Sequence, residues 1–467
     1  MSDAPRLTVL EVRLYERPVR LRLPFRFGMI TLREAPQAFA RVLVQGHDGR
    51  EAWGAAAEML VPKWFDKSPD LSNEENIAHL RAAAHKAAGL YREAGAATSW
   101  ELSSACYVDQ VAQCAHMGMN SLVAGFGTAL LDRAVLDALC RLQGSSVFEA
   151  VRANLPGLVW DDLDMTPFVA DRPVPESIAV RHTVGMVDPL DDADRSAETD
   201  IHDGLPVTLE DAIAAYGCRH FKITVSDDVD AALARLERIA AILDRSPEPY
   251  AVTIDGGEQF TDIAGVAALW AAIAGSPKLE RLRRSCEFLE QPLHRDVTFD
   301  QEIAAAGVDC PVIIDEADGA FDAFPRARDL GYRGVSYKGC KGIYKGLINA
   351  ARCAAWNAEL SEERYFMTAE DLTTQAGICV QQDTAMAALI GVAHVQRNGH
   401  HYANGMQGVP ETEAVAFLDA HPDLYHRADG VVRLTVEDGK IALGSLARPG
   451  FARAAEPAWE TMEAMAS

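Results

Sequence analysis

The second half of the chain repeats one unit, a short apolar run typical of a buried strand followed by a helical stretch. The ends of six consecutive runs are separated by 33, 35, 25, 23 and 29 residues, at Lys222, Asp255, Glu290, Asp315, Lys338 and Met367. This spacing is typical of β-α units that build a parallel sheet. Seven or eight such units exceed what an open nucleotide-binding sheet needs and fit a closed (β/α) barrel of about 250 residues.

The segment before the repeat has a different pattern. Residues 7–16 and 37–58 read as strands, the second stretch folding about an HDG turn. Residues 73–94 and 126–142 follow as predicted helices, and the second helix should stop at Gly144. These patterns predict an antiparallel sheet with a layer of helices.

The fold class that follows is α/β, a TIM-type (β/α) barrel with a separate α+β unit. We place the N-terminal unit over residues 1–156, the barrel over 157–404 and a C-terminal segment over 405–467. Within the last segment, residues 430–443 read as a hairpin that we expect to return to the N-terminal sheet.

Composition excludes several classes of function. The chain has 467 residues, with 68 Asp+Glu against 44 Lys+Arg and a formal net charge of −24, so nucleic acid and anionic membranes would be repelled. The longest uncharged apolar stretch, near residues 264–275, is too short to span a bilayer, and the start lacks the order of a secretory signal. We therefore expect a cytoplasmic protein. Nine cysteines without a C-x-x-C pair indicate buried thiols.

Charged residues stand at the ends of the predicted barrel strands. They are Asp255 in AVTIDGG, Glu290 in CEFLEQ, Asp315 in PVIIDE, Lys338 in GVSYKG and, near the end of its strand, Lys222 in HFKITV. A single aspartate at a strand end is often only a turn former or a helix cap. In a barrel, however, the carboxyl ends of the strands share one mouth, where active sites lie. The recurrence therefore predicts a site there.

Three acids in one mouth favour a bound cation. Two carboxylates about 4 Å apart repel by about 4 kcal/mol at an effective dielectric constant of about 20. Oxygen ligands select a hard ion, so we predict Mg²⁺, with Mn²⁺ possible, at Asp255, Glu290 and Asp315. A metal charge about 6 Å from Lys338 would disfavour its ammonium by about 2.8 kcal/mol and leave neutral amine for general-base catalysis. Lys341 is expected to lie on the following loop without a role.

These residues carry a resemblance to a known family. The three acids, the phrases EFLEQPL and IIDEA, and the lysine of the sixth strand resemble the enolase superfamily, in its mandelate racemase and muconate cycloisomerase branch. The similarity covers nearly the whole chain, because the segment containing PFRFG resembles that family's capping domain and DGKIALGSLARPGF resembles its C-terminal return. The resemblance implies a capping domain over 1–156, with the loop around Phe25 covering the mouth and contacting substrate.

The resemblance also implies a reaction, the Mg²⁺-assisted removal of a proton α to a carboxylate through an enediolate. Asp255 and Glu290 would be metal ligands with Asp315 as the third, although Glu316 could compete for that place. Lys338 would be the base, and Lys222 would neutralise the substrate carboxylate. Members of such families are often homo-oligomers, so one is expected here, with a small carboxylate as the binding partner.

Two departures from the family pattern narrow the chemistry. The strand-two motif is usually Lys-x-Lys, but the second position here is Thr224, so a two-base racemase is disfavoured. The seventh strand, RYFMTAED, has no histidine, and we interpret its Asp371 as a helix cap. Chemistry that needs one lysine remains: β-elimination by a lyase (dehydratase) or a cycloisomerisation. The alternatives are a catalytically impaired carboxylate binder on the same fold, and a different metal-dependent barrel.

Histidines could replace the missing proton carrier. His182 lies in the predicted first barrel strand, and His400 and His401 stand where the eighth should end. We expect His182 and His401 to contact substrate, since a histidine there could deliver a proton to a leaving hydroxyl. Substrate identity and stereochemistry stay open at this stage.

Overall fold

The computed structural model describes residues 4–27, 30–160, 163, 165 and 173–467. Its N-terminal part is an antiparallel sheet of β1 (Leu7–Phe27), β2 (Ile30–Gly46) and β3 (Glu51–Met59), joined on the outer edge of β1 by β15 (Glu463–Ala464). The turn between β2 and β3 has Gly49 at a φ of +81°, a backbone conformation that favours glycine. The predicted HDG turn is therefore present.

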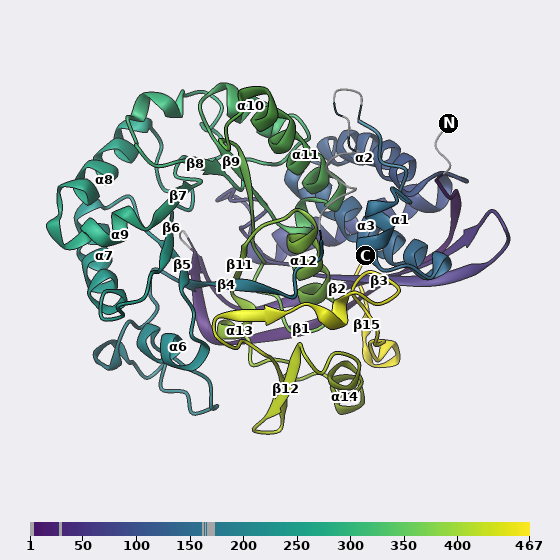
Figure 1. Cartoon of the computed structure of the whole chain (residues 1–467). Coiled ribbons are helices and arrows are strands. Elements are labelled where there is room, and N and C mark those ends of the chain that lie inside the picture. Colours follow the sequence, from purple (N-terminus) through teal and green to yellow (C-terminus); the bar gives the residue numbers. More distant parts are fainter. Residues whose placement is uncertain (1–3, 28–29, 161–162, 164, 166–172) are drawn as a thin grey trace.

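Four helices pack beside this sheet: α1 (Asn73–Glu93), α2 (Ser99–Ala115), α3 (Ser121–Gln143) and α4 (Val147–Arg152). Helix α3 ends at Gly144, which adopts a left-handed conformation, as the sequence predicted. A Cβ at Gly54 would lie 2.0 Å from the carbonyl oxygen of Ala134, so glycine lets α3 pack directly on β3. Figure 1 shows α1 to α3 beside the long purple strands.

A closed barrel of eight parallel strands forms the second part. In order these are β4 (Ser177–Val184), β5 (His220–Thr224), β6 (Ala251–Asp255), β7 (Cys286–Glu290), β8 (Val312–Ile314), β9 (Gly334–Tyr337), β10 (Phe366–Ala369) and β11 (His394–Arg397). Each strand pairs with the next, and β11 pairs with β4 to close the ring. The predicted α/β class with a TIM-type barrel and an antiparallel capping sheet is confirmed.

Helices cover the outside of the barrel (Figure 1). They are α6 (Leu209–Tyr216), α7 (Val229–Leu243), α8 (Ile263–Gly275), α9 (Glu280–Arg284), α10 (Ala323–Asp329), α11 (Ile343–Leu360), α12 (Ile378–Leu389) and α13 (Gly399–Tyr402), followed by α14 (Glu411–Ala420). Single 3-10 turns are η1 (Asp192–Asp194), η2 (Pro277–Leu279), η3 (Ile303–Ala306), η4 (Gly339–Lys341), η5 (Gly444–Leu446) and η6 (Trp459–Thr461). No helix in the described ranges is both long and apolar enough to cross a membrane.

The C-terminal segment contacts both parts. Strands β12 (Tyr425–Ala428) and β13 (Val431–Leu434) form a separate two-stranded sheet, and β14 (Lys440–Ala442) pairs antiparallel with β4 of the barrel. Only β15 joins the N-terminal sheet. The predicted destination of the hairpin was wrong, because strand pairing depends on which exposed edge the chain reaches and not on local pattern.

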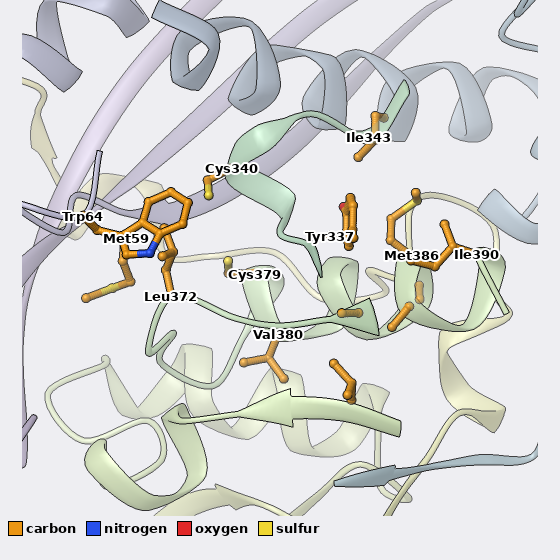
Figure 2. Packing of buried hydrophobic residues seen from close by; sticks show 14 of the residues in the cluster. Met59, Trp64, Tyr337, Cys340, Ile343, Leu372, Cys379, Val380, Met386 and Ile390 are labelled. Carbon is orange, nitrogen blue, oxygen red and sulfur yellow. The ribbon is translucent and has the colours of Figure 1, made fainter. Parts of the chain in front are cut away.

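The capping domain and the barrel meet through a buried core and a buried charge network. Figure 2 shows Met59 and Trp64 of the capping domain near Leu372 and Cys379 of the barrel. Arg133 of α3 is fully buried and pairs with Glu58 of β3 at 3.0 Å and with Asp383 of α12 at 3.6 Å. Glu58, Cys379 and Asp383 lie close enough to hold a cation, but the guanidinium of Arg133 already contacts all three.

This network predicts a pH-dependent stability. Burial and then the nearby Glu58 raise the pKa of Asp383 to about 7, despite Arg133. The folded state therefore keeps a proton that the unfolded chain releases, and the free energy of unfolding should fall by a few kcal/mol between about pH 4 and about pH 7. In urea titrations, Asp383→Asn should flatten this slope, whereas Asn at the exposed Asp227 should not. An unchanged slope in Asp383→Asn would contradict the assignment.

Candidate active site

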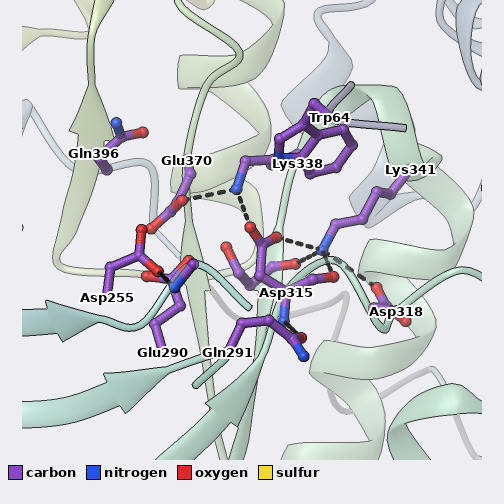
Figure 3. A network of polar contacts seen from close by, with 12 residues as sticks. Trp64, Asp255, Glu290, Gln291, Asp315, Asp318, Lys338, Lys341, Glu370 and Gln396 are labelled. Carbon is purple, nitrogen blue, oxygen red and sulfur yellow. Dashed lines mark hydrogen bonds and ion pairs between the residues drawn. The ribbon is translucent and has the colours of Figure 1, made fainter. Parts of the chain in front are cut away.

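Three acidic side chains lie together at the mouth of the barrel. Asp255 is the last residue of β6, Glu290 is the last residue of β7, and Asp315 directly follows β8. Asp255 and Glu290 are register partners in the parallel ladder, so their side chains emerge side by side. Figure 3 shows Asp255, Glu290 and Asp315 in one cluster with Glu370 and Lys338. The structure thus brings together the acids that the sequence singled out.

Both predicted lysines reach the same cluster. Lys222, on β5, places its Nζ 3.1 Å from Asp255 Oδ2 and 2.9 Å from Glu290 Oε1. Lys338, directly after β9, donates a hydrogen bond to Asp315. The two side chains are buried, with exposed fractions of 6% for Lys222 and 4% for Lys338, so their charges are compensated by neighbours and not by water.

A fourth acid, Glu370, lies between the two lysines and was missed in the sequence. Its Oε2 accepts hydrogen bonds from Lys222 at 2.6 Å and from Lys338 at 2.7 Å, while its Oε1 accepts one from Arg181 at 2.7 Å. Glu370 directly follows β10, so the strand-end rule that found the other acids applies to it as well. In the sequence, its neighbour Asp371 was singled out instead.

The acids fit a divalent cation. One oxygen each from Glu290, Asp315 and Glu370 lie within 4.8 Å of one another. Glu290 Oε2 is buried without a hydrogen-bond partner, and a cation bound to this acid set would satisfy it. An all-oxygen set of this kind suits Mg²⁺ or Mn²⁺. Asp255 stands beside this compact set, in contact with Lys222.

The electrostatics follow from burial and from the surplus of acids. Burial, followed by the nearby carboxylates of Glu370, Asp255 and Asp315, raises the pKa of Glu290 well above its usual range. Burial alone would lower the pKa of Lys338, but Asp315 and Glu370 outweigh it and raise that pKa well above its ordinary value. Among protein groups alone, Lys338 is therefore an ammonium. The neutral amine expected from the sequence requires the additional positive charge of a metal.

A cavity of about 60 Å³ adjoins these groups, and the capping domain forms part of its wall. Phe25, from the end of β1, lines it together with Trp64 and Lys67 from the segment after β3. The Trp64 ring lies 5.2 Å from Lys338 Nζ, close enough for a cation-π contact (Figure 3). Phe25 is thus where a residue in contact with substrate would be expected.

Another part of the cavity wall is neutral and polar. It is formed by Thr183, Thr224, Gln396 and Asn398. Gln396 donates to Thr183 Oγ1 at 2.7 Å, and Asn398 Oδ1 is buried without a partner. Thr224, the last residue of β5, stands where the Lys-x-Lys pattern of the similar family would have its second lysine. Among the described residues of this wall there is no ammonium or imidazole.

His182 and His401 do not line this cavity. Successive residues of a strand face opposite sides, and because Thr183 faces the cavity, His182 faces outward. There His182 Nδ1 lies 3.2 Å from His400 Nε2, and its ring centroid is 4.9 Å from that of His401. Burial lowers the pKa of His182 to about 4. The structure therefore groups these histidines in a neutral cluster outside the barrel.

Asp371 and Lys341 both make contacts that differ from those expected from the sequence. Asp371 does not cap the next helix in the chain, because α12 begins at Ile378. Its Oδ1 accepts from the backbone N–H groups of Thr373 and of Asn398, the residue that precedes α13. Lys341 is not a loop residue without a role, since it is buried and donates to Asp315 Oδ1 at 3.0 Å.

Glu316, the alternative third ligand, lines the same cavity. Burial and the neighbouring Asp315 raise its pKa to about 7. It lies outside the compact set formed by Glu290, Asp315 and Glu370. The geometry of the described acids therefore favours Asp315 over Glu316 for contact with a shared cation.

The fold and the site together define a capped (β/α) barrel whose mouth holds a carboxylate cluster beside two lysines. No family model and no curated protein matches the chain. Solved structures do match it in three dimensions. The muconate lactonizing enzyme from Pseudomonas fluorescens complexed with muconolactone is 16% identical with a TM-score of 0.60, over 96% of this chain and 97% of that chain.

Two others are similar. The L-Ala-D/L-Glu epimerase from Bacillus subtilis is 14% identical with a TM-score of 0.58, over 95% of this chain and 98% of that chain. A member of the enolase superfamily from Roseovarius nubinhibens is 15% identical with a TM-score of 0.56, over 97% of this chain and 96% of that chain. The chain therefore has the fold of the enolase superfamily, and the resemblance in its sequence is confirmed at that level.

Proposed function

We propose that this protein is a Mg²⁺-dependent enzyme of the enolase superfamily that removes a proton α to the carboxylate of a small acid. The observation that carries the proposal is the partnerless, buried Glu290 Oε2 within an acid cluster that also contacts Lys338. Such a cluster is costly unless a cation joins it, and a hard cation beside a lysine is what this chemistry needs. The similar solved structures support the proposal by fold.

Each site residue has a chemical task in this proposal. Glu290 and Asp315, which belong both to the trio predicted from the sequence and to the compact set, would hold the ion, with Glu370 and Asp255 as the further carboxylates beside it. When bound, the ion supplies positive charge that polarises the substrate carboxylate and offsets the acids that raise the pKa of Lys338. Lys338 Nζ then accepts the α-proton.

The remaining groups bind and orient. Lys222 pairs with the substrate carboxylate, and Glu370 fixes Lys222 and Lys338 relative to each other through its shared Oε2. Trp64 and Phe25 line the cavity from the capping domain and would limit the access of water. Since exclusion of water strengthens each charge interaction, this arrangement supports proton transfer at a weakly acidic carbon.

The neutral wall favours reactions that use one lysine. With Thr224 and Asn398 in place of a second base, an elimination from a hydroxy acid or a cycloisomerisation suits the site better than racemisation, which needs proton transfer on both faces. Asn398 Oδ1 would accept a hydrogen bond from a substrate hydroxyl. We therefore propose a lyase (dehydratase) or a cycloisomerase, acting in a homo-oligomer.

The test is proton exchange in D₂O. The protein, with Mg²⁺, is incubated with collections of hydroxy acids, sugar acids and unsaturated diacids, and NMR follows deuterium uptake or product. We expect Mg²⁺-dependent turnover of at least one small carboxylate, abolished by EDTA and restored by Mg²⁺. Ligand binding without exchange across all collections would instead support the impaired carboxylate binder.

A further inference from the structure

Two cysteines lie in contact at the amino ends of neighbouring barrel strands. Cys286 is the first residue of β7, and Cys310 stands two residues before β8. Their Sγ atoms are 3.7 Å apart. None of the nine cysteines forms a disulfide in the structure, and Cys286 and Cys310 are in direct sulfur–sulfur contact. The pair is therefore a distinct feature of this barrel.

The backbone already holds the two residues at nearly the same height. Strands β7 and β8 are parallel neighbours, and Leu289 is the register partner of Val312. Cys286 and Cys310 lie three and two residues before that pair. Adjacent strands are about 4.8 Å apart, within the separation that a disulfide can bridge, and bond formation would close the sulfur gap by about 1.6 Å.

Only one of the two cysteines is open to a reagent in solution. Cys286 is partly exposed, whereas Cys310 is buried with an exposed fraction of 8%. An oxidant can therefore reach Cys286 first, with Cys310 in place as the resolving thiol. The hydrogen bond shared by the two thiols, and then burial, raise the pKa of the Cys286 thiol, so the reaction should be slow at neutral pH and faster in alkaline solution.

We propose that Cys286 and Cys310 form a modification site, at which a low-molecular-weight disulfide such as oxidised glutathione introduces a reversible intrachain disulfide. The Cys286 thiolate attacks oxidised glutathione, forming a mixed disulfide and releasing one glutathione thiolate. The Cys310 sulfur then attacks Sγ of Cys286 and releases the second. The two protein thiols are oxidised, glutathione disulfide is reduced to two thiols, and the protons pass to the released glutathione.

The bond would join the bases of two strands whose opposite ends carry candidate metal ligands. Strand β7 ends in Glu290, and β8 leads directly into Asp315. Because a crosslink removes conformational freedom from the unfolded chain, the oxidised protein should melt about 3 °C or more above the reduced protein. A melting temperature of the oxidised protein at or below that of the reduced protein would refute the expected stabilisation by the crosslink.

The test uses the full-length protein treated with oxidised glutathione in alkaline buffer, then denatured and alkylated. Intact mass should show seven alkylated cysteines in place of nine, peptide mapping should show a Cys286–Cys310 link, and dithiothreitol should restore all nine. Cys310→Ser, or Cys310→Ala if serine impairs folding, should stop at a glutathione adduct on Cys286. Cys340→Ser is the control and should retain the link. Nine alkylated cysteines, or a lasting glutathione adduct on the unmodified sequence, would overturn the proposal.

Discussion

Lys338→Met should lower substrate-dependent deuterium exchange by about 10³-fold or more while Mg²⁺ binding is kept. Methionine is similar in length but has no group that accepts a proton. The Lys338 ammonium also neutralises Asp315 and Glu370, so its removal leaves more negative charge in the cluster. Mg²⁺ affinity, measured by calorimetry, should therefore stay equal or increase, and the metal-free variant should be less stable.

Lys341→Met is the matched control. Lys341 also pairs with Asp315, at 3.0 Å, but does not line the cavity. It should perturb the acid cluster to a similar degree without removing the proton acceptor, so exchange should remain within about tenfold of the parent in folded protein. Full exchange in Lys338→Met, or an equal loss in both variants, would refute the assignment of Lys338 as the base.

Glu290→Gln should weaken Mg²⁺ binding by about 100-fold or more and abolish exchange with it. The amide keeps the shape of the side chain but loses the charge of the buried, partnerless oxygen that fits a cation. Without metal, the Glu290→Gln variant should be more stable at neutral pH than the metal-free parent. Burial and neighbouring acids raise the pKa of Glu290, so the folded metal-free protein keeps a proton that the unfolded chain releases, stability falls as the pH rises to neutral, and glutamine removes that loss.

Glu287→Gln tests whether any acid of the strand would give this result. Glu287 lies three residues earlier on β7, near the other end of the barrel, where its carboxylate is 2.9 Å from His394 Nε2. Its replacement should leave Mg²⁺ affinity unchanged. If calorimetry shows the same affinity for Glu290→Gln as for the parent, Glu290 is not a ligand and the metal-dependent function fails with it.

The two main variants also distinguish the proposed enzyme from an impaired binder. An enzyme loses exchange in both variants but loses metal affinity only in Glu290→Gln. A binder without catalysis shows no exchange in the parent either, while Glu290→Gln still loses the metal. Mg²⁺ affinity therefore tests the assignment of Glu290 as a ligand even if no deuterium exchange is detected in the parent.

Much of the barrel could be predicted because its signal is local. Buried strands of a parallel barrel are short apolar runs, and their spacing reflects the helix needed to return to the same end of the sheet. The charged residue that ends each run is visible in the sequence, as with Asp255, Glu290 and Asp315. Since carboxyl ends of parallel strands share one mouth, their convergence followed from the fold class alone.

Other features depend on direction and distance, which local pattern does not encode. Glu370 and Asp371 are neighbours directly after β10 and both line the cavity, but Glu370 contacts Lys222 and Lys338, whereas Asp371 accepts from backbone N–H groups. On β4, the alternation of side chains along the strand puts Thr183 in the cavity and His182 outside it. In each pair, a shift of one residue along the chain decides which groups the side chain contacts.

The sequence by itself determined the class of fold, the strand ends that meet at the mouth and the acids and lysines available there, because hydrophobic periodicity and strand order act over short stretches of chain. Only the tertiary structure decided which carboxylates share one space, that both lysines are held by Glu370, and that the histidines form a cluster outside the barrel. These outcomes depend on the side-chain direction at each strand position and on contacts between residues far apart in the chain, and both are fixed only when the barrel closes.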